Sequence, residues 1–151
     1  MRRVRTLAAW FGLVVSVVVA YPAGASAATP GELVIREINR FRAAYGLQPV
    51  HASASLTRSA FSYSRAMMAW DYFGHARRIQ ASSRFQSLGE VLELHGGRGP
   101  AVKATVDSWK RSPLHRAALL DPSYRQIGAG RTYGRFQGRR ATVWVVQLGR
   151  R

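Results

Sequence analysis

The segment 141–148 constrains the fold most, because it has the pattern of a β-strand that is apolar on both faces. Its central residues are β-branched or aromatic, and only Thr142 and Gln147 are polar. A strand that is apolar on both sides has to be covered on both sides. The chain is therefore predicted to fold as a sheet enclosed between two layers, and helices are the candidates for those layers.

Four amphipathic segments are predicted to form the covering helices. Thr29-Pro30-Gly31-Glu32 has the pattern of a capping box with proline at the first helical position, and the helix is expected over 30–45. A second helix is expected from the N-cap Ser53 to a terminator at Gly74, a third from Pro100, and a fourth from Ser112-Pro113 to about Leu120.

The remaining strands are expected over 89–95 and 126–136, and 137–140 has the composition of a hairpin loop. Helices precede strands, and the last two strands are joined by a hairpin. The pattern therefore predicts an α+β fold, a three-layer α-β-α sandwich with a small antiparallel sheet, in one domain over 28–151.

Residues 1–27 have the pattern of a secretory signal peptide. Three arginines precede an uncharged apolar run over 7–21, and Ala25-Ser26-Ala27 is a small-x-small cleavage signal. The run is shorter than the roughly 20 residues of a membrane span. We therefore expect a secreted or periplasmic, cell-envelope protein without a transmembrane anchor after cleavage. The chain has no cysteine, so disulfides and thiol chemistry are excluded.

The formal charge is +16, and it is +13 without residues 1–27. Of the 23 basic residues, 21 are arginine, against only seven acids. Such a chain should be attracted to polyanions. For an exported protein, an anionic envelope polymer or lipid is the expected partner. Nucleic acid is disfavoured by the leader and by the absence of a groove-reading element, and a monomer is expected.

Two histidines follow helix-boundary signals that fix their direction. His75 follows the terminator Gly74, and His115 lies in the first turn after Ser112-Pro113, where the helix dipole favours a neutral imidazole. Glu90 is the candidate carboxylate, and we predict that these three side chains share one cleft.

Two histidines and a carboxylate are a plausible ligand set for zinc with an open position. The spacing is not that of a helix-borne zinc motif, so it is weak evidence by itself. The alternative for Glu90 is an ion pair with one of the arginines. Glu93 is the competing acid, and it would point to the opposite face of an extended segment. His51 and His95 are expected in loops without a chemical role.

Several motifs occur together in a fixed order: Asn39-x-x-Arg42, Phe73-x-His75, Gly89-Glu90, Trp109-x-x-Ser112-Pro113-x-His115-Arg116, and a closing Val143-Trp144-Val145-x-Gln147. In this respect the chain resembles the CAP superfamily (cysteine-rich secretory proteins, antigen 5, pathogenesis-related 1), in its bacterial SCP-like branch. The resemblance covers about 30–149, and the segment from Trp109 to Arg116 is its most specific part.

The resemblance implies an α-β-α sandwich with a large surface cleft that commonly holds two histidines and two acids. His75 and His115 match the histidines, which can bind a divalent metal, and Glu90 matches the first acid. Ser112 stands where the second acid usually lies, and Val91 stands where asparagine is usual. Trp109, Ser112 and Arg116 are expected to shape the cleft.

Two functions follow from these residues. The first is a secreted binding module that holds a lipid, sterol, glycan or other envelope component in the cleft, with or without a divalent metal. The second is a metal-dependent hydrolase of peptide or envelope polymer. In that version His75 and His115 would hold zinc, and Glu90 would ligate the metal or act as general base.

Overall fold

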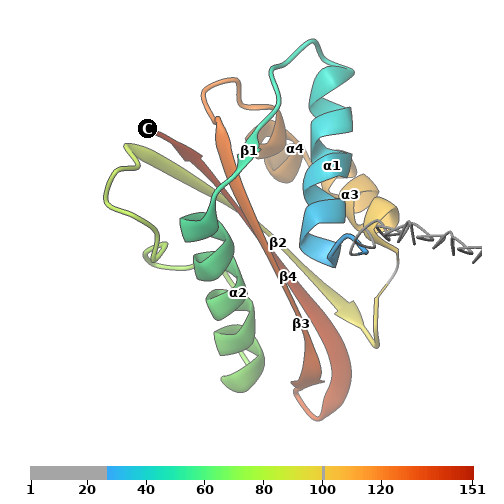
Figure 1. Ribbon diagram of the computed structural model, residues 1–151. Helices are drawn as coiled ribbons and strands as arrows, with labels where there is room; N and C mark the ends of the chain where they lie inside the picture. Colours follow the sequence, from blue (N-terminus) through green and yellow to red (C-terminus); the bar gives the residue numbers. More distant parts are fainter. Residues whose placement is uncertain (1–26, 100) are drawn as a thin grey trace, which may run out of the picture.

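A computed structural model describes residues 27–99 and 101–151, in which two helix–strand pairs are followed by two helices and a long hairpin (Figure 1). Nearly all of the predicted leader, residues 1–26, lies outside the described residues. The described elements are α1 (Pro30–Ala43), β1 (His51–Ala52), α2 (Ala54–Ala69), β2 (Ser87–Gly96), α3 (Val102–Arg111), α4 (Pro113–Leu120), β3 (Gln126–Phe136) and β4 (Arg139–Arg150).

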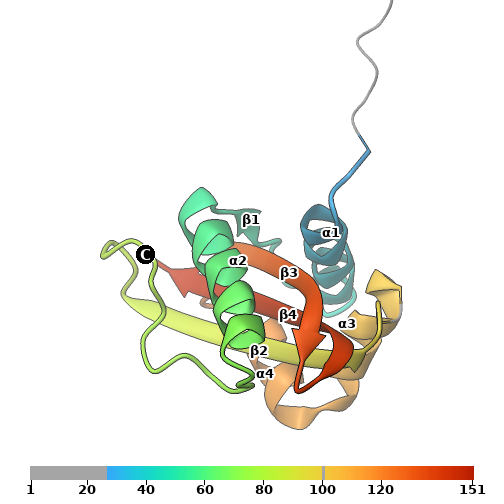
Figure 2. The ribbon, with the colours of Figure 1, turned by 90° about the horizontal axis from the view of Figure 1, so that it is seen from below.

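The strands form one sheet in the order β1-β3-β4-β2, and helices cover both of its faces. Helix α2 packs on one face, while α1, α3 and α4 gather on the other (Figure 2). The α+β sandwich predicted from the doubly apolar strand is therefore confirmed. No helix among the described residues is long and apolar enough to cross a membrane.

Strand β4 divides the core into two parts by the alternation of its side chains. Val143 and Val145 pack with Met67 of α2. Trp144 and Val146 point the other way and belong to the cluster that contains Trp109 of α3. Each face of β4 thus has its own apolar partner layer, which is why the segment can be apolar throughout.

The sheet is mixed, because the short β1 runs parallel to β3. His51 and Ala52 align with Gln126 and Ile127, and the His51 N–H donates to the Arg125 carbonyl at 2.9 Å. The other pairs, β3 with β4 and β4 with β2, are antiparallel as expected. A two-residue strand is too short to show an alternating pattern. The sequence therefore predicted a connecting loop at this place.

Glycines in β3 allow helix α2 to lie directly against the sheet. A Cβ at Gly128 would collide with the backbone of Leu56 and Thr57, and one at Gly130 would collide with the backbone of Phe61. The glycine-rich composition of this strand therefore reflects close approach of a helix rather than flexibility.

The predicted caps and turns are largely confirmed. Thr29 and Glu32 form the reciprocal capping box, and Ser53 caps α2. The predicted four-residue hairpin loop is shorter than expected, because β4 already begins at Arg139. Gln137 and Gly138 alone make the turn with φ of 46° and 78°, the left-handed pair that matches strand twist.

Arg42 of α1 is fully buried, although the helical pattern did not mark it as a core residue. Its guanidinium donates to the carbonyl oxygens of Gln48 at 3.0 Å, Leu119 at 2.7 Å and Asp121 at 3.0 Å. Burial lowers the pKa of Arg42 below its usual value. The side chain therefore ties α1 to the loop that follows it and to the end of α4.

Replacing Arg42 should destabilise the fold strongly. In Arg42→Met the buried carbonyls lose their donor, so the free energy of unfolding should fall by about 3 kcal/mol. Urea unfolding followed by tryptophan fluorescence measures the change. Arg36→Met, at an exposed position of the same helix, is the matched control and should change little. Equal effects of the two substitutions would contradict this role of Arg42.

Candidate functional site

Glu90 lies on β2, the edge strand, directly opposite Gln147 of β4. Its carboxylate is 6% exposed and has three partners. Oε1 accepts from the Ala76 N–H at 2.9 Å and lies 3.1 Å from Nδ1 of His75, while Oε2 accepts from Nε2 of Gln147 at 2.9 Å. The alternative, an ion pair between Glu90 and an arginine, is absent from the ion pairs of the described residues.

His75 reaches Glu90 because the chain turns sharply after α2. The helix ends at Ala69, earlier than the predicted terminator Gly74, and Asp71 adopts a left-handed φ of 50°. The Tyr63 hydroxyl then donates to the Gly74 carbonyl at 2.7 Å and fixes the segment next to His75. Burial, reinforced by the Glu90 charge, raises the pKa of Tyr63. The His75 side chain is 62% exposed, so solvent and ligands can reach it.

His115 of α4 lies on the side of the sheet opposite α2, together with Glu93. The pKa of His115 is lowered, first by burial and further by the charge of His75, while the Glu93 carboxylate raises it in part. Ser112 occupies the N-cap position of α4, but its side chain makes no capping hydrogen bond. Burial is therefore the largest cause of the lowered pKa of His115, whereas the sequence had suggested the dipole at the start of the helix.

Two more of the predicted residues have structural contacts. Trp109 is buried, and its indole N–H donates to the Leu92 carbonyl at 3.1 Å. The Arg116 guanidinium lies over the rings of Phe41 and Tyr45, at 5.3 and 4.7 Å from their centres. Both residues hold α3 and α4 in place around the site.

Of the three predicted site residues, two are in direct contact and the third is a neighbour of that pair. His75 and Glu90 touch, and His115 lies close enough for the charge of His75 to lower its pKa. Among the described residues, no three His, Asp or Glu side chains form a group that could hold a metal ion. The donor set as it stands does not fit a three-ligand zinc centre, and an ion shared by His75 and His115 stays a prediction.

Three further residues that build this site were not predicted from the sequence. Gln147 was visible as a polar residue in an apolar strand, and that was the available signal for its contact with Glu90. Ser108 Oγ donates to Glu93 Oε2 at 2.5 Å, and Tyr63 fixes the segment before His75. These two contacts span 15 and 11 residues, which is longer than one helical turn or one strand repeat, so no local pattern marks them.

Comparison with known proteins agrees with this architecture, a mixed sheet covered by helices on both faces. The profile of the cysteine-rich secretory protein (CAP) family matches residues 35–148. The chain therefore belongs to the CAP family, although it contains no cysteine.

Three relatives illustrate the match. The "uncharacterized membrane protein YlbC" of Bacillus subtilis is 30% identical over 101 residues, which is 61% of this chain and only 28% of that protein. An outer surface protein of Borrelia burgdorferi has a TM-score of 0.65 at 20% identity, covering 79% of this chain and 90% of that chain. An extracellular SCP-domain protein of Bacillus anthracis has a TM-score of 0.62 at 18% identity, covering 81% and 40%.

The pKa of His115 should depend on the charges of His75 and Glu93. NMR of the ring protons should give a pKa below 6.5, which rises in His75→Gln and falls further in Glu93→Gln. Because the folded-state pKa is depressed, the unfolded chain binds the proton more readily. The stability contributed by neutral His115 is therefore present above pH 6.5 and lost as the pH falls from there toward the folded pKa. An unchanged pKa in His75→Gln would show that the two imidazoles do not interact.

Glu90 should also hold the segment after α2 in place. In Glu90→Ala the Ala76 N–H and the Gln147 amide lose their acceptor, so stability should fall by about 2 kcal/mol. Trypsin should then cleave faster after Arg77 and Arg78, which are exposed in this segment. Asp107→Ala, which removes a carboxylate from α3, is the control, and faster cleavage in both variants would contradict a local role.

Proposed function

We propose that this CAP-family protein is a secreted binding module that holds an anionic component of the cell envelope. The proposal rests on how few of the arginines are paired with a carboxylate of the protein. Among the ion pairs of the described residues, Arg40 is the single arginine that contacts a carboxylate. Most of the large positive charge is therefore available to an external polyanion.

Three arginines gather near the turn that joins β3 and β4 and the loop after β2. Arg98, Arg131 and Arg140 form what we name the arginine cluster. Arg98 and Arg140 lie over the Tyr133 ring, at 4.7 and 5.8 Å from its centre, and Arg131 lies 5.6 Å from the centre of a Trp144 ring. The Arg131 guanidinium also donates to the Arg98 carbonyl at 2.7 Å.

Aromatic stacking and a backbone contact hold these guanidinium planes in place without neutralising them. Pre-oriented guanidinium groups suit phosphate and carboxylate oxygens, which they bind with two parallel hydrogen bonds. The arginine cluster therefore supports a polymer with repeated anionic groups as the partner.

The second candidate is a hydrolase of peptide or envelope polymer. It is favoured by the exposed His75 imidazole, which the buried Glu90 carboxylate orients. In the metal-dependent version a zinc ion would be shared with His115. That version needs metal in the purified protein and activity that a chelator removes, and metal analysis of the protein beside His75→Ala and His115→Ala tests it.

Binding to the envelope should be electrostatic and concentrated at the arginine cluster. The protein should sediment with an insoluble cell-wall fraction at low salt and be released as salt rises. The double variant Arg98→Ser/Arg140→Ser should be released at lower salt. Arg36→Ser/Arg111→Ser removes the same charge at exposed positions elsewhere and is the control. Equal release of the two variants would show that the cluster has no special role, and no sedimentation at low salt would contradict the function.

A further inference from the structure

A small pocket lies between helix α2 and the segment 76–80, on the face of the sheet that α2 covers. Ser59, Tyr63 and Ala66 of α2 line it, and Ala76 and Ile79 line it from the segment that follows. Its volume is about 180 Å³, below the range of about 300–1,000 Å³ typical of sites that enclose a whole small molecule. The pocket therefore has the size to hold one substituent of a ligand rather than the complete ligand.

Gln147 of β4 also lines this pocket, and its side chain is fully buried. The amide Nε2 donates to the Glu90 carboxylate at 2.9 Å. Because a carboxylate can only accept, this contact sets the orientation of the amide and leaves Oε1 on its other side. Among the described residues, Oε1 is the one buried side-chain nitrogen or oxygen atom without a hydrogen-bond partner. A buried acceptor without a donor is costly, so a ligand that brings a donor to this atom is favoured.

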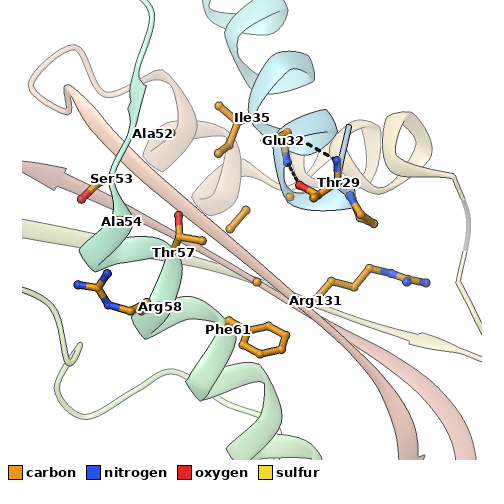
Figure 3. Close-up of a pocket in the computed structure, with 14 residues that line it drawn as sticks. Thr29, Glu32, Ile35, Ala52, Ser53, Ala54, Thr57, Arg58, Phe61 and Arg131 are labelled. Atoms are coloured by element: carbon orange, nitrogen blue, oxygen red, sulfur yellow. Dashed lines mark hydrogen bonds between the residues drawn. The ribbon is translucent and has the colours of Figure 1, made fainter. Parts of the chain in front are cut away.

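The larger apolar groove between α1 and α2 has no such requirement. Thr29 and Glu32, which line it, already pair with each other through the capping box, at 2.8 and 3.2 Å (Figure 3). The unpartnered acceptor of the described residues lies in the small pocket instead. The small pocket is therefore the cavity with the better-defined chemical preference.

Two exposed side chains stand at the mouth of the small pocket. Trp70, the residue that follows the last turn of α2, is 70% exposed although it is large and apolar. Arg78 is also exposed, and it is not in the ion pairs of the described residues. A ligand that enters the pocket therefore meets a flat aromatic ring and a free guanidinium at the entrance.

These features together restrict the group that the pocket can take. Oε1 of Gln147 needs an N–H or O–H donor. The apolar walls at Ala66, Ala76 and Ile79 favour a methyl group and disfavour a charged ammonium, whose burial is costly. The Arg78 guanidinium donates only, so it suits a carbonyl oxygen. A secondary acetamide combines the N–H, the methyl and the carbonyl oxygen in one small group.

We propose that this pocket binds the N-acetyl group of an amino sugar in a cell-envelope glycan. The acetamide N–H donates to Oε1 of Gln147, the methyl lies against Ala66 and Ile79, and the carbonyl oxygen accepts from Arg78. The sugar ring lies on the exposed ring of Trp70, which offers it a large apolar face. The recognised group is neutral and the pocket is separate from the arginine cluster, so the inference goes beyond the proposed function.

Calorimetry with sugar tetramers tests the pocket on the full chain. The tetramer of β-1,4-linked N-acetylglucosamine should bind. The glucose tetramer with the same linkage lacks the acetamide and should bind at least about tenfold more weakly. Because the N-acetylated tetramer is neutral, its affinity should be the same at low and high salt. Equal binding of the two tetramers, or no binding of the N-acetylated one, would overturn the proposal.

An acetylated lysine carries the same acetamide, so it tests whether the ligand is a sugar. N-acetyl-lysine amide has no sugar ring to cover Trp70, and it should therefore bind more weakly than the N-acetylated tetramer. Binding as tight as that of the tetramer would assign the pocket to an acetylated protein and overturn the glycan.

Two pairs of variants test the pocket and its mouth. Gln147 is buried and holds Glu90, so Ala66 is the better position to change. Ala66→Leu should fill the pocket and weaken the N-acetylated tetramer at least about tenfold, whereas Ala69→Leu, exposed on the same helix and outside the pocket, should not. Trp70→Ala should also weaken it about tenfold, and Phe61→Ala, another exposed aromatic of α2, is its control.

Urea unfolding shows that each variant is folded before binding is measured. The result expected is weaker binding in Ala66→Leu and Trp70→Ala alone. Equal losses within either pair would overturn the pocket.

Cell-wall sedimentation separates this inference from the proposed function. The double variant Arg98→Ser/Arg140→Ser should bind the N-acetylated tetramer as tightly as the unmodified protein, because neither arginine lines the pocket. Loss of tetramer binding in that variant would place the glycan at the arginine cluster and overturn the pocket. A protein that sediments with the cell wall at low salt but binds no tetramer would overturn the pocket alone and leave the proposed function standing.

Discussion

The buried guanidinium of Arg42 is the contact on which the arrangement of the helices depends. It donates to carbonyl oxygens at the end of α4 and in the loop after α1, segments that are far apart in the chain. A buried charge is costly unless hydrogen bonds satisfy it, so this geometry is tightly specified. It fixes α1 against the sheet, and α1 in turn supplies Ile35 to one wall of an apolar groove between α1 and α2.

The doubly covered sheet explains why the candidate site lies at an edge. Glu90 and Glu93 are three residues apart on β2, so they face opposite layers. Glu90 meets His75 on the side of α2, and Glu93 lies near His115 on the side of α4. At an edge strand such as β2, groups from both layers can approach each other without crossing the apolar core.

Much of this fold follows from local patterns. The capping box at Thr29, the N-cap Ser53 and the doubly apolar strand each act within a few residues, and the structure bears them out. The sequence also placed His75 and Glu90 in one cleft, from the helix-boundary signal before His75 and the family resemblance at Gly89-Glu90, and the two side chains are in contact. Burial of Arg42 and the pairing of β1 were not predicted, because both depend on partners about eighty residues away.

The acidic residues explain why so many arginines remain available. All seven carboxylates lie in the described part of the chain, and each has a partner within the protein. Some stabilise local backbone, as Asp121 does by accepting from the Ser123 N–H, and others pair with lysine, Arg40 or His75. With the acids engaged in this way, the positive surface is left uncompensated. A polymer held by this surface alone should therefore depend strongly on salt.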